Sequence, residues 1–332
     1  MTCVTGKEKK NSIINDRLIK TAYDIATEDQ ENQDVAYISA PLCHVFLPYS
    51  NPGDADFWVQ SHGNFHLSIE AIRVVNPVTN DPERFGLPYG AKPRLILSLL
   101  NTVILKQRSP EIMLGNSLTD FVRDYLKLDA NGRTINDVKN QLARLSTSLI
   151  SATYSLENNH TKHDSLKLIR GVDVWWTKDA NQRHLWGNYL RFSDDYFQDI
   201  MEHGVPVDRR ALSALSGNAL SLDLYAFLAH RLHYIPANKP LLISWKAIKE
   251  QFGQSYNRMD KFKAVFRHTL QMVKVVYSDA RIEEIDNKGF VLRNSSPPVL
   301  PNTSIVVPAI PGLEMEDRPP LFGNDAVGSS KI

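Results

Sequence analysis

Two stretches of the sequence carry polar and basic side chains at spacings that suit contact with a DNA groove. In residues 134–150, the apolar residues fall on one helical face, which must be buried: Ile135, Val138, Leu142, Leu145 and Leu149. The opposite face and its edges present Arg133, Asn136, Lys139, Asn140, Arg144 and Thr147. Because Asn can pair with adenine and Arg with guanine in the major groove, this composition suits base recognition.

Residues 257–274 repeat the pattern with a more basic outer face. The predicted buried residues are Phe262, Val265, Phe266, Leu270 and Val273. The predicted outward residues are Lys261, Lys263, Arg267, His268, Gln271 and Lys274, with Asp260 beside them. We expect Arg267 and Gln271 to read bases and Lys274 to hold a phosphate. The alternative for each helix is an ordinary solvated face, but both helices precede a predicted hairpin, which favours DNA contact.

The distribution of charge supports contact with a polyanion. The formal net charge of +1 hides a division along the chain. Residues 1–60 carry five Lys/Arg against nine Asp/Glu, whereas residues 84–150 carry ten against five and residues 244–274 seven against two. Two separate basic helical regions indicate two contacts with a polyanion such as nucleic acid. Two solvated helix faces would give the same charge pattern.

Other site chemistries find little support in the sequence. Residues 86–93, GLPYGAKP, lack both the glycine spacing and the Ser or Thr of a phosphate-binding P-loop. They predict a rigid turn before a helix, with Lys92 and Arg94 placed to approach phosphate at the helix N-terminus. No His-x-His pair of a nicking nuclease occurs among the ten histidines, and no serine-hydrolase or metalloprotease motif is present. A zinc site is conceivable only from Cys43, His44, His62 and His66.

Length and composition bound the class of protein. The chain has 332 residues with 42% hydrophobic and 23% charged residues, which is typical of two globular units rather than a disordered or fibrous protein. The longest apolar stretch is too short and too interrupted to span a membrane, and no secretory signal follows the basic N-terminal residues. Two cysteines cannot form a disulfide framework. We therefore expect a cytoplasmic protein without cofactor or metal.

The elements that would position these helices fall into five segments. Residues 1–34 predict a flexible or marginally helical acidic leader, and residues 297–332 predict a disordered proline-rich tail. Residues 35–84 are strand-rich, with short β-branched and aromatic runs at 45–47, 57–59, 65–69 and 72–75 that predict hairpin strands. Residues 85–200 and 205–296 are the two larger units. The fold class is thus α+β and mainly helical.

Both larger units predict the order of a winged helix-turn-helix. In the first, helices are expected from residue 92 to 105, over 117–128 and over 134–150, with capping signatures at Ser117 and Thr134. A hairpin with strands near 152–156 and 166–176 should follow. In the second, helices at 208–232, 245–252 and 257–274 precede a hairpin folded over residues 286–289, where Lys288 would grip phosphate. We interpret the protein as two tandem winged-helix domains behind a strand-rich segment.

Several motifs resemble the RepA-type plasmid replication initiators. These are GLPYGAKPRLIL at 86–97, SPEI at 109–112, LGNSL at 114–118, PVD at 206–208, ALSLDLY at 219–225, QFG at 251–253 and SPPV at 296–299. The resemblance covers roughly residues 40–300. It implies a protein that binds direct repeats (iterons) at an origin, promotes opening of the duplex and recruits host replication proteins, namely the host initiator and the replicative helicase. It also implies dimers that interconvert with monomers, although the sequence shows no recognisable dimer motif.

The interpretation is therefore a sequence-specific double-stranded DNA-binding protein with no catalytic activity of its own. Two alternatives stay open: a transcriptional repressor, and a metal-dependent nicking nuclease, which the absence of His-x-His disfavours. In the tail, Leu321 and Phe322 loosely resemble the end of a sliding-clamp-binding peptide, but the expected Gln and first Leu are missing. An incidental apolar pair in a solvated tail explains them better.

Overall fold

The protein folds into a mixture of helices and strands built around two central helices. The structure, a computed structural model, describes residues 6–27, 33–76, 80–113, 117–155, 161–162, 169–172, 189–285 and 287–299. Within these ranges the fold is α+β and mainly helical, as predicted. The predicted tail, with Leu321 and Phe322, lies outside the described residues. None of the helices in the described part of the chain has an apolar stretch that would cross a bilayer.

The leader contains a helix that packs on the rest of the protein. Helix α1 (Gly6–Thr27) contacts α6 (Arg209–Ala214) and α9 (Met259–Val276). Leu18 of α1 is buried, and Arg17 Nη2 donates to Ser213 Oγ at 2.7 Å. The described part of this segment is therefore helical, which is one of the two predicted forms.

The strand-rich segment pairs with distant parts of the chain. Its elements are β1 (Val35–Ser39), η2 (Pro41–Cys43), β2 (Phe57–His62), β3 (Phe65–Ala71), β4 (Val74–Val75) and β5 (Pro82–Glu83). The β2–β3 hairpin forms as predicted, with His62 opposite Phe65. However, β1 pairs with β11 (Gly204–Asp208), and β3 pairs with β7 (Ser148–Ser155). Residues 45–47 form no strand; they are buried loop residues.

The first larger unit keeps the predicted helices but not the predicted hairpin. Its elements are α2 (Ala91–Gln107), β6 (Glu111–Met113), α3 (Leu118–Asp120), the π-helical turn η3 (Phe121–Tyr125), α4 (Gly132–Ser146), β7, β8 (Thr161–Lys162), β9 (Ile169–Val172), β10 (Tyr189–Phe192) and α5 (Asp194–His203). Strand β7 joins the sheet β2-β3-β7-β8, whereas β9 pairs with β10. The expected pairing of strands 152–156 and 166–176 is therefore wrong, because β3 and β8 are the two neighbours of β7.

The second larger unit follows the predicted order closely. Its elements are α6, α7 (Ala219–Arg231), η4 (Leu232–Tyr234), β12 (Leu241–Ser244), α8 (Trp245–Phe252), α9, β13 (Ile282–Ile285) and β14 (Gly289–Leu292). The β13–β14 hairpin closes with Ile285 opposite Gly289, at the predicted turn. We call this hairpin and its turn the second wing.

The two larger units share one strand arrangement. Each contains an antiparallel three-stranded sheet in which the last strand lies between the first and the middle strand: β6-β10-β9 in one unit and β12-β14-β13 in the other. In each unit the first strand follows a long buried helix, α2 or α7, and precedes an amphipathic helix, α4 or α9. The chain therefore repeats a helix and sheet pattern, with β7 and β8 inserted in the first copy.

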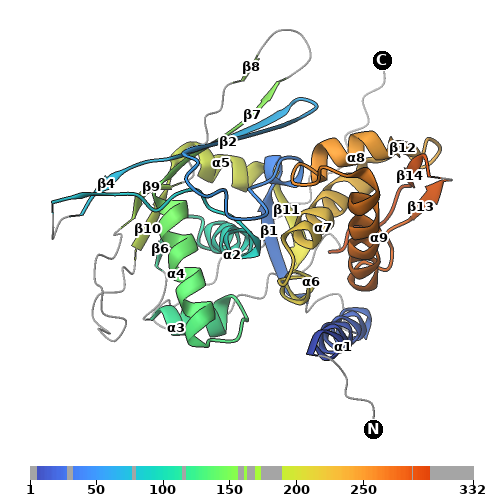
Figure 1. The fold of residues 1–332 in the computed structure, drawn as a ribbon, viewed down its shortest axis with the longest axis horizontal. Coiled ribbons are helices and arrows are strands. Elements are labelled where there is room, and N and C mark those ends of the chain that lie inside the picture. Colours follow the sequence, from blue (N-terminus) through green and yellow to red (C-terminus); the bar gives the residue numbers. More distant parts are fainter. Residues whose placement is uncertain are drawn as a thin grey trace, which may run out of the picture.

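The core lies where the two units meet. Helices α2 and α7 are buried over most of their length and contact each other. Figure 1 shows α2, β1 and α7 in the middle of the molecule, with α4 on one side and α9 on the other. This arrangement places the two amphipathic helices at opposite ends of a shared apolar centre.

Candidate nucleic-acid interface

Helix α9 presents the polar face that the sequence predicts. Phe262, Phe266, Leu270 and Val273 are buried, and Val265 is half-buried, so the predicted apolar face is confirmed. Lys261, His268, Gln271 and Lys274 are exposed on the other side. Lys274 Nζ also donates to the Ile282 carbonyl at 3.4 Å, which holds this ammonium near the start of β13. The face offers cations and hydrogen-bonding groups to a groove.

Two other predicted contact residues of α9 turn toward the second wing. Arg267 forms a bidentate ion pair with Glu284, with Nη2–Oε1 at 2.6 Å and Nε–Oε2 at 2.9 Å. Lys263 Nζ donates to the Asn287 carbonyl at 3.4 Å. Both cations lie over the Trp245 ring, each 5.2 Å from its centroid. Arg267 is thus occupied within the protein instead of pointing freely outward.

The tip of the second wing carries Lys288, which is exposed. Its backbone fixes the turn, because Lys288 N donates to Ile285 O at 2.7 Å and Trp245 N donates to Lys288 O at 3.0 Å. Gly289 follows at φ +159°, where an added Cβ would lie 2.0 Å from Ile243 O. Only glycine permits this approach to β12. The turn therefore packs closely against β12 and the start of α8, and the Lys288 side chain is exposed at its tip.

Helix α4 has a similar polar face, but it starts and ends earlier than predicted. Arg133, Asn136 and Asn140 are exposed and Lys139 is half-buried. The helix begins after Asn131, whose Oδ1 accepts from Thr134 N at 2.9 Å, so the cap is three residues earlier than the predicted Thr134. It ends at Ser146 because β7 starts at Ser148.

Two predicted contact residues at the end of α4 serve the protein interior instead. Thr147 is 3% exposed and its Oγ1 donates to Ala143 O at 2.8 Å, since the chain leaves the helix there. Arg144 Nη1 donates to Leu87 O at 2.9 Å, and its guanidinium lies 5.1 Å from the centroid of the Tyr89 ring. Burial lowers the pKa of Arg144. Arg144 therefore anchors the GLPYG turn.

The turn also contacts α4 through Gly86. At Gly86, φ is +80°, and an added Cβ would lie 2.9 Å from Arg144 Nη1. The positive φ favours glycine here, and the missing Cβ leaves room for the guanidinium. The GLPYG motif is thus a docking turn for α4, in agreement with the prediction of a rigid turn.

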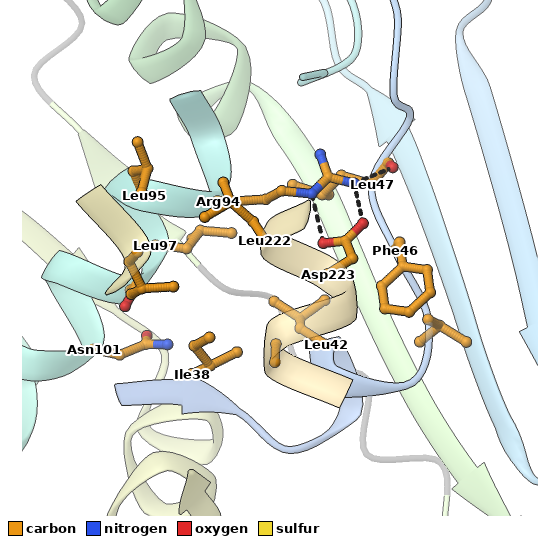
Figure 2. Close-up of a pocket in the computed structure, with 14 residues that line it drawn as sticks. Ile38, Leu42, Phe46, Leu47, Arg94, Leu95, Leu97, Asn101, Leu222 and Asp223 are labelled. Atoms are coloured by element: carbon orange, nitrogen blue, oxygen red, sulfur yellow. Dashed lines mark hydrogen bonds and ion pairs between the residues drawn. The ribbon is translucent and has the colours of Figure 1, made fainter. Parts of the chain in front are cut away.

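Arg94 is buried in an ion pair and does not approach a surface phosphate position. Its Nε and Nη2 donate to the two carboxylate oxygens of Asp223, both at 2.7 Å (Figure 2). Further bonds reach the carbonyls of Leu47 and Gly90, both at 2.6 Å. The side chains of Arg94 and Asp223 are 9% and 6% exposed. The expectation of a phosphate contact by Arg94 is therefore wrong.

Asp223 is a structural residue that sequence reasoning missed. It lies on α7, in the ALSLDLY motif, between residues that are all buried. A single carboxylate inside an apolar helix signals a buried cationic partner, because an unpaired buried charge is strongly destabilising. Together with Arg94 at the start of α2, this carboxylate is sufficient to predict the ion pair from the sequence.

A comparison with known protein families bears on the motifs that form these contacts. Residues 87–247 match the family model described as plasmid encoded RepA protein. We call this stretch, which resembles the RepA family and covers just under half of the chain, the RepA segment. The RepA segment runs from Leu87 in the docking turn to α8, and it includes α2, α4, α7 and the Arg94–Asp223 pair. Helix α9 and the second wing follow it in the chain.

Solved structures show a weaker likeness. A crystal structure of domains 2-3 of RctB has a TM-score of 0.45 at 9% identity, covering 74% of this chain and 92% of that chain. A second structure, of selenomethionine derivatives of domain 2 and domain 3 of RctB, has a TM-score of 0.44 at 9% identity, covering 77% and 98%. No curated protein matches the chain.

A small cavity lies beside the Arg94–Asp223 pair, between the RepA segment and residues 38–47. Figure 2 shows Ile38, Leu42 and Leu97 around it, and its volume is about 40 Å³. Ser98 Oγ and Asn101 Nδ2 border it and have no hydrogen-bond partner among the described residues. This volume suits one or two water molecules rather than a nucleotide.

The four residues considered for zinc are not brought together. Cys43 Sγ lies 3.7 Å from Ser39 O, His66 Nδ1 lies 2.9 Å from Ser61 Oγ, and His44 Nε2 lies 2.9 Å from Nδ1 of His230 on α7. Within the ranges that the structure describes, no three His, Cys, Asp or Glu side chains are grouped to hold a metal ion.

Proposed function

We propose that this protein is a plasmid replication initiator that binds double-stranded origin DNA with two winged-helix units. The observation that carries the proposal is the repeated unit in a chain that contains the RepA segment: one strand order occurs twice, each time behind a helix with an exposed polar face. In a winged helix, such a helix enters the major groove and the hairpin grips the backbone.

The exposed residues divide into groups that can read bases and groups that can hold phosphate. Asn136 and Asn140 on α4, and His268 and Gln271 on α9, carry groups that can hydrogen-bond to base edges. The remaining exposed or half-exposed cations can neutralise phosphates: Arg133, Lys139, Lys261, Lys274 and Lys288. The RepA resemblance extends the proposal to iterons as the binding sites and to opening of the origin. It also names the host initiator and replicative helicase as partners.

The test is binding of the purified protein to fragments from the region flanking its gene, with nonspecific competitor at several salt concentrations. We expect a competitor-resistant footprint of about 20 base pairs, because two major grooves on one face of DNA lie about one turn apart. If about eight phosphates are neutralised, a plot of log affinity against log salt concentration has a slope of about −7. No preference among fragments, or a slope near zero, would reject the proposal.

Binding alone does not separate an initiator from a repressor. A plasmid carrying the origin but lacking the gene should replicate only when the protein is supplied in trans. DNA binding without such replication would favour the repressor, and nicking of supercoiled DNA with a divalent metal would favour the nuclease.

A further inference from the structure

The recognition helix α9 and the second wing are joined by a closed polar cluster, which we call the wing clamp. It consists of Arg267 on α9, Glu284 on β13, Asn287 in the turn and Trp245 at the start of α8. Arg267 Nη2 donates to both Glu284 Oε1 at 2.6 Å and Asn287 Oδ1 at 3.0 Å, while Nε donates to Glu284 Oε2 at 2.9 Å. One guanidinium thus connects the helix to both the strand and the turn.

The geometry of the clamp suits a fixed orientation more than a mobile side chain. The guanidinium lies over the buried Trp245 ring while two of its nitrogens engage one carboxylate. Bidentate pairs of this kind are directional as well as strong. Hydrogen bonding to Arg267 lowers the pKa of Glu284, so this carboxylate is ionised at neutral pH.

The clamp acts on the part of the wing that bears Lys288. Asn287 precedes Lys288, and both of its polar ends are held from α9: its side chain by Arg267 and its carbonyl by Lys263 at 3.4 Å. Trp245, under the guanidinium, also donates its backbone N–H to the Lys288 carbonyl. Any change in the clamp would therefore move the turn and redirect the Lys288 ammonium.

We propose that Arg267 is a positioning residue that fixes the second wing against α9 so that Lys288 meets a phosphate, and that it does not itself read a base. This inference rests on the proposed DNA-binding function. The competing role has Arg267 leave Glu284 to bind DNA. The two roles predict opposite effects for a weaker contact between Arg267 and Glu284. If Arg267 positions the wing, DNA binding weakens because the wing is no longer held; if Arg267 binds DNA, binding tightens because the carboxylate competes less for the guanidinium.

The decisive variant is Glu284→Asp, which keeps the charge but shortens the side chain, so that the bidentate contact is lost. Its matched control is Glu283→Asp on the same strand, where the native carboxylate makes only an exposed pair with Arg293 at 3.4 Å. We expect Glu284→Asp to weaken binding to cognate and scrambled duplexes alike, by about fivefold, because a phosphate contact is sequence-independent. Glu283→Asp should bind as the native protein does.

Coupling to Lys288 makes the test specific. In the native background, Lys288→Ala should reduce the salt slope by about one. In the Glu284→Asp background it should cause no further reduction, because Lys288 is already misplaced. Tighter cognate binding by Glu284→Asp, or an undiminished effect of Lys288→Ala in that background, would overturn the proposal.

Hydrogen exchange separates this inference from the proposed function. Arg267→Lys and Glu284→Asp should speed exchange of the Lys288 amide, which bonds to Ile285 O, without changing the exchange of buried α7 amides. Unchanged exchange at Lys288 would overturn the clamp even if DNA binds. Failure of the native protein to prefer any DNA would reject the proposed function, and faster exchange would then still support the clamp.

Discussion

At the residue scale, Gln271 and Lys274 test the division between base reading and phosphate contact on α9. Both are exposed and lie within one helical turn of each other. We expect Gln271→Ala to reduce the preference for the cognate repeat over a scrambled one by about tenfold, the loss of one base contact. Lys274→Ala should weaken binding to both duplexes equally. Competition binding measures both ratios, and equal losses in the two variants would show that α9 does not read bases through Gln271.

A second residue-scale prediction concerns the paired imidazoles of His44, which is buried, and His230, which is half-buried. Burial, reinforced by nearby positive groups, lowers the pKa of His44 to about 3 and that of His230 to about 4, from an ordinary 6.5. Between these pH values and 6.5 the unfolded chain binds more protons than the folded one, so the free energy of unfolding falls as pH is lowered from 7 to 4.

The variant His230→Gln removes one of these titrating groups. Over the same pH range, its free energy of unfolding should therefore fall by about 2 kcal/mol less than that of the native protein. This is less than the full pKa shift would give, because solvent partly screens a half-buried group. Urea denaturation at pH 7 and pH 4 measures the difference. Parallel pH profiles for the two proteins would contradict the assignment.

The same scale shows what single residues reveal in a sequence. The exposure of Lys261, His268 and Gln271 could be predicted, because helical periodicity separates an apolar from a polar face. The role of Arg144 could not be predicted, because a basic residue on a predicted outer face can still bend toward a carbonyl that lies far away in sequence.

At the element scale, the junction between α8 and α9 depends on Gly253. A Cβ at this position would lie 2.8 Å from Lys249 O and 3.0 Å from the Phe262 ring. We expect Gly253→Ala to push α9 away from α8, lowering the free energy of unfolding by about 1–3 kcal/mol and weakening DNA binding. Gly217→Ala is the matched control, since its Cβ would meet nothing within 4 Å. Similar stabilities for the two variants in urea would contradict the tight junction.

Local pairing explains which elements the sequence could predict. The β2–β3 and β13–β14 hairpins join neighbouring segments, so turn residues and alternating side chains were sufficient. The pairing of β1 with β11 and of β3 with β7 joins strands that are far apart in the chain. Periodicity identifies such strands but carries no information about their partners. The predicted hairpin of strands 152–156 and 166–176 is therefore wrong where the distant strand β3 pairs with β7.

At the scale of the whole molecule, the Arg94–Asp223 pair joins the two units through α2 and α7. Asp223→Ala would leave an uncompensated buried guanidinium, so we expect a loss of about 3–5 kcal/mol in the free energy of unfolding. The double variant Arg94→Met with Asp223→Leu should lose less, because no buried charge remains. Thermal denaturation of the two proteins measures this order. A single variant as stable as the double variant would mean that water reaches the pair.

The packing of α2 on α7 also determines what the two units can do together. In the part of the chain that the structure describes, a continuous apolar core and the β1–β11 pair lie between α4 and α9. On the proposed function, the distance between the two bound grooves is then a property of the protein interior. Such a protein would distinguish two plasmids whose repeats carry the same two contact sequences at different distances from each other. The two plasmids could then share a cell, because neither would bind the initiator of the other.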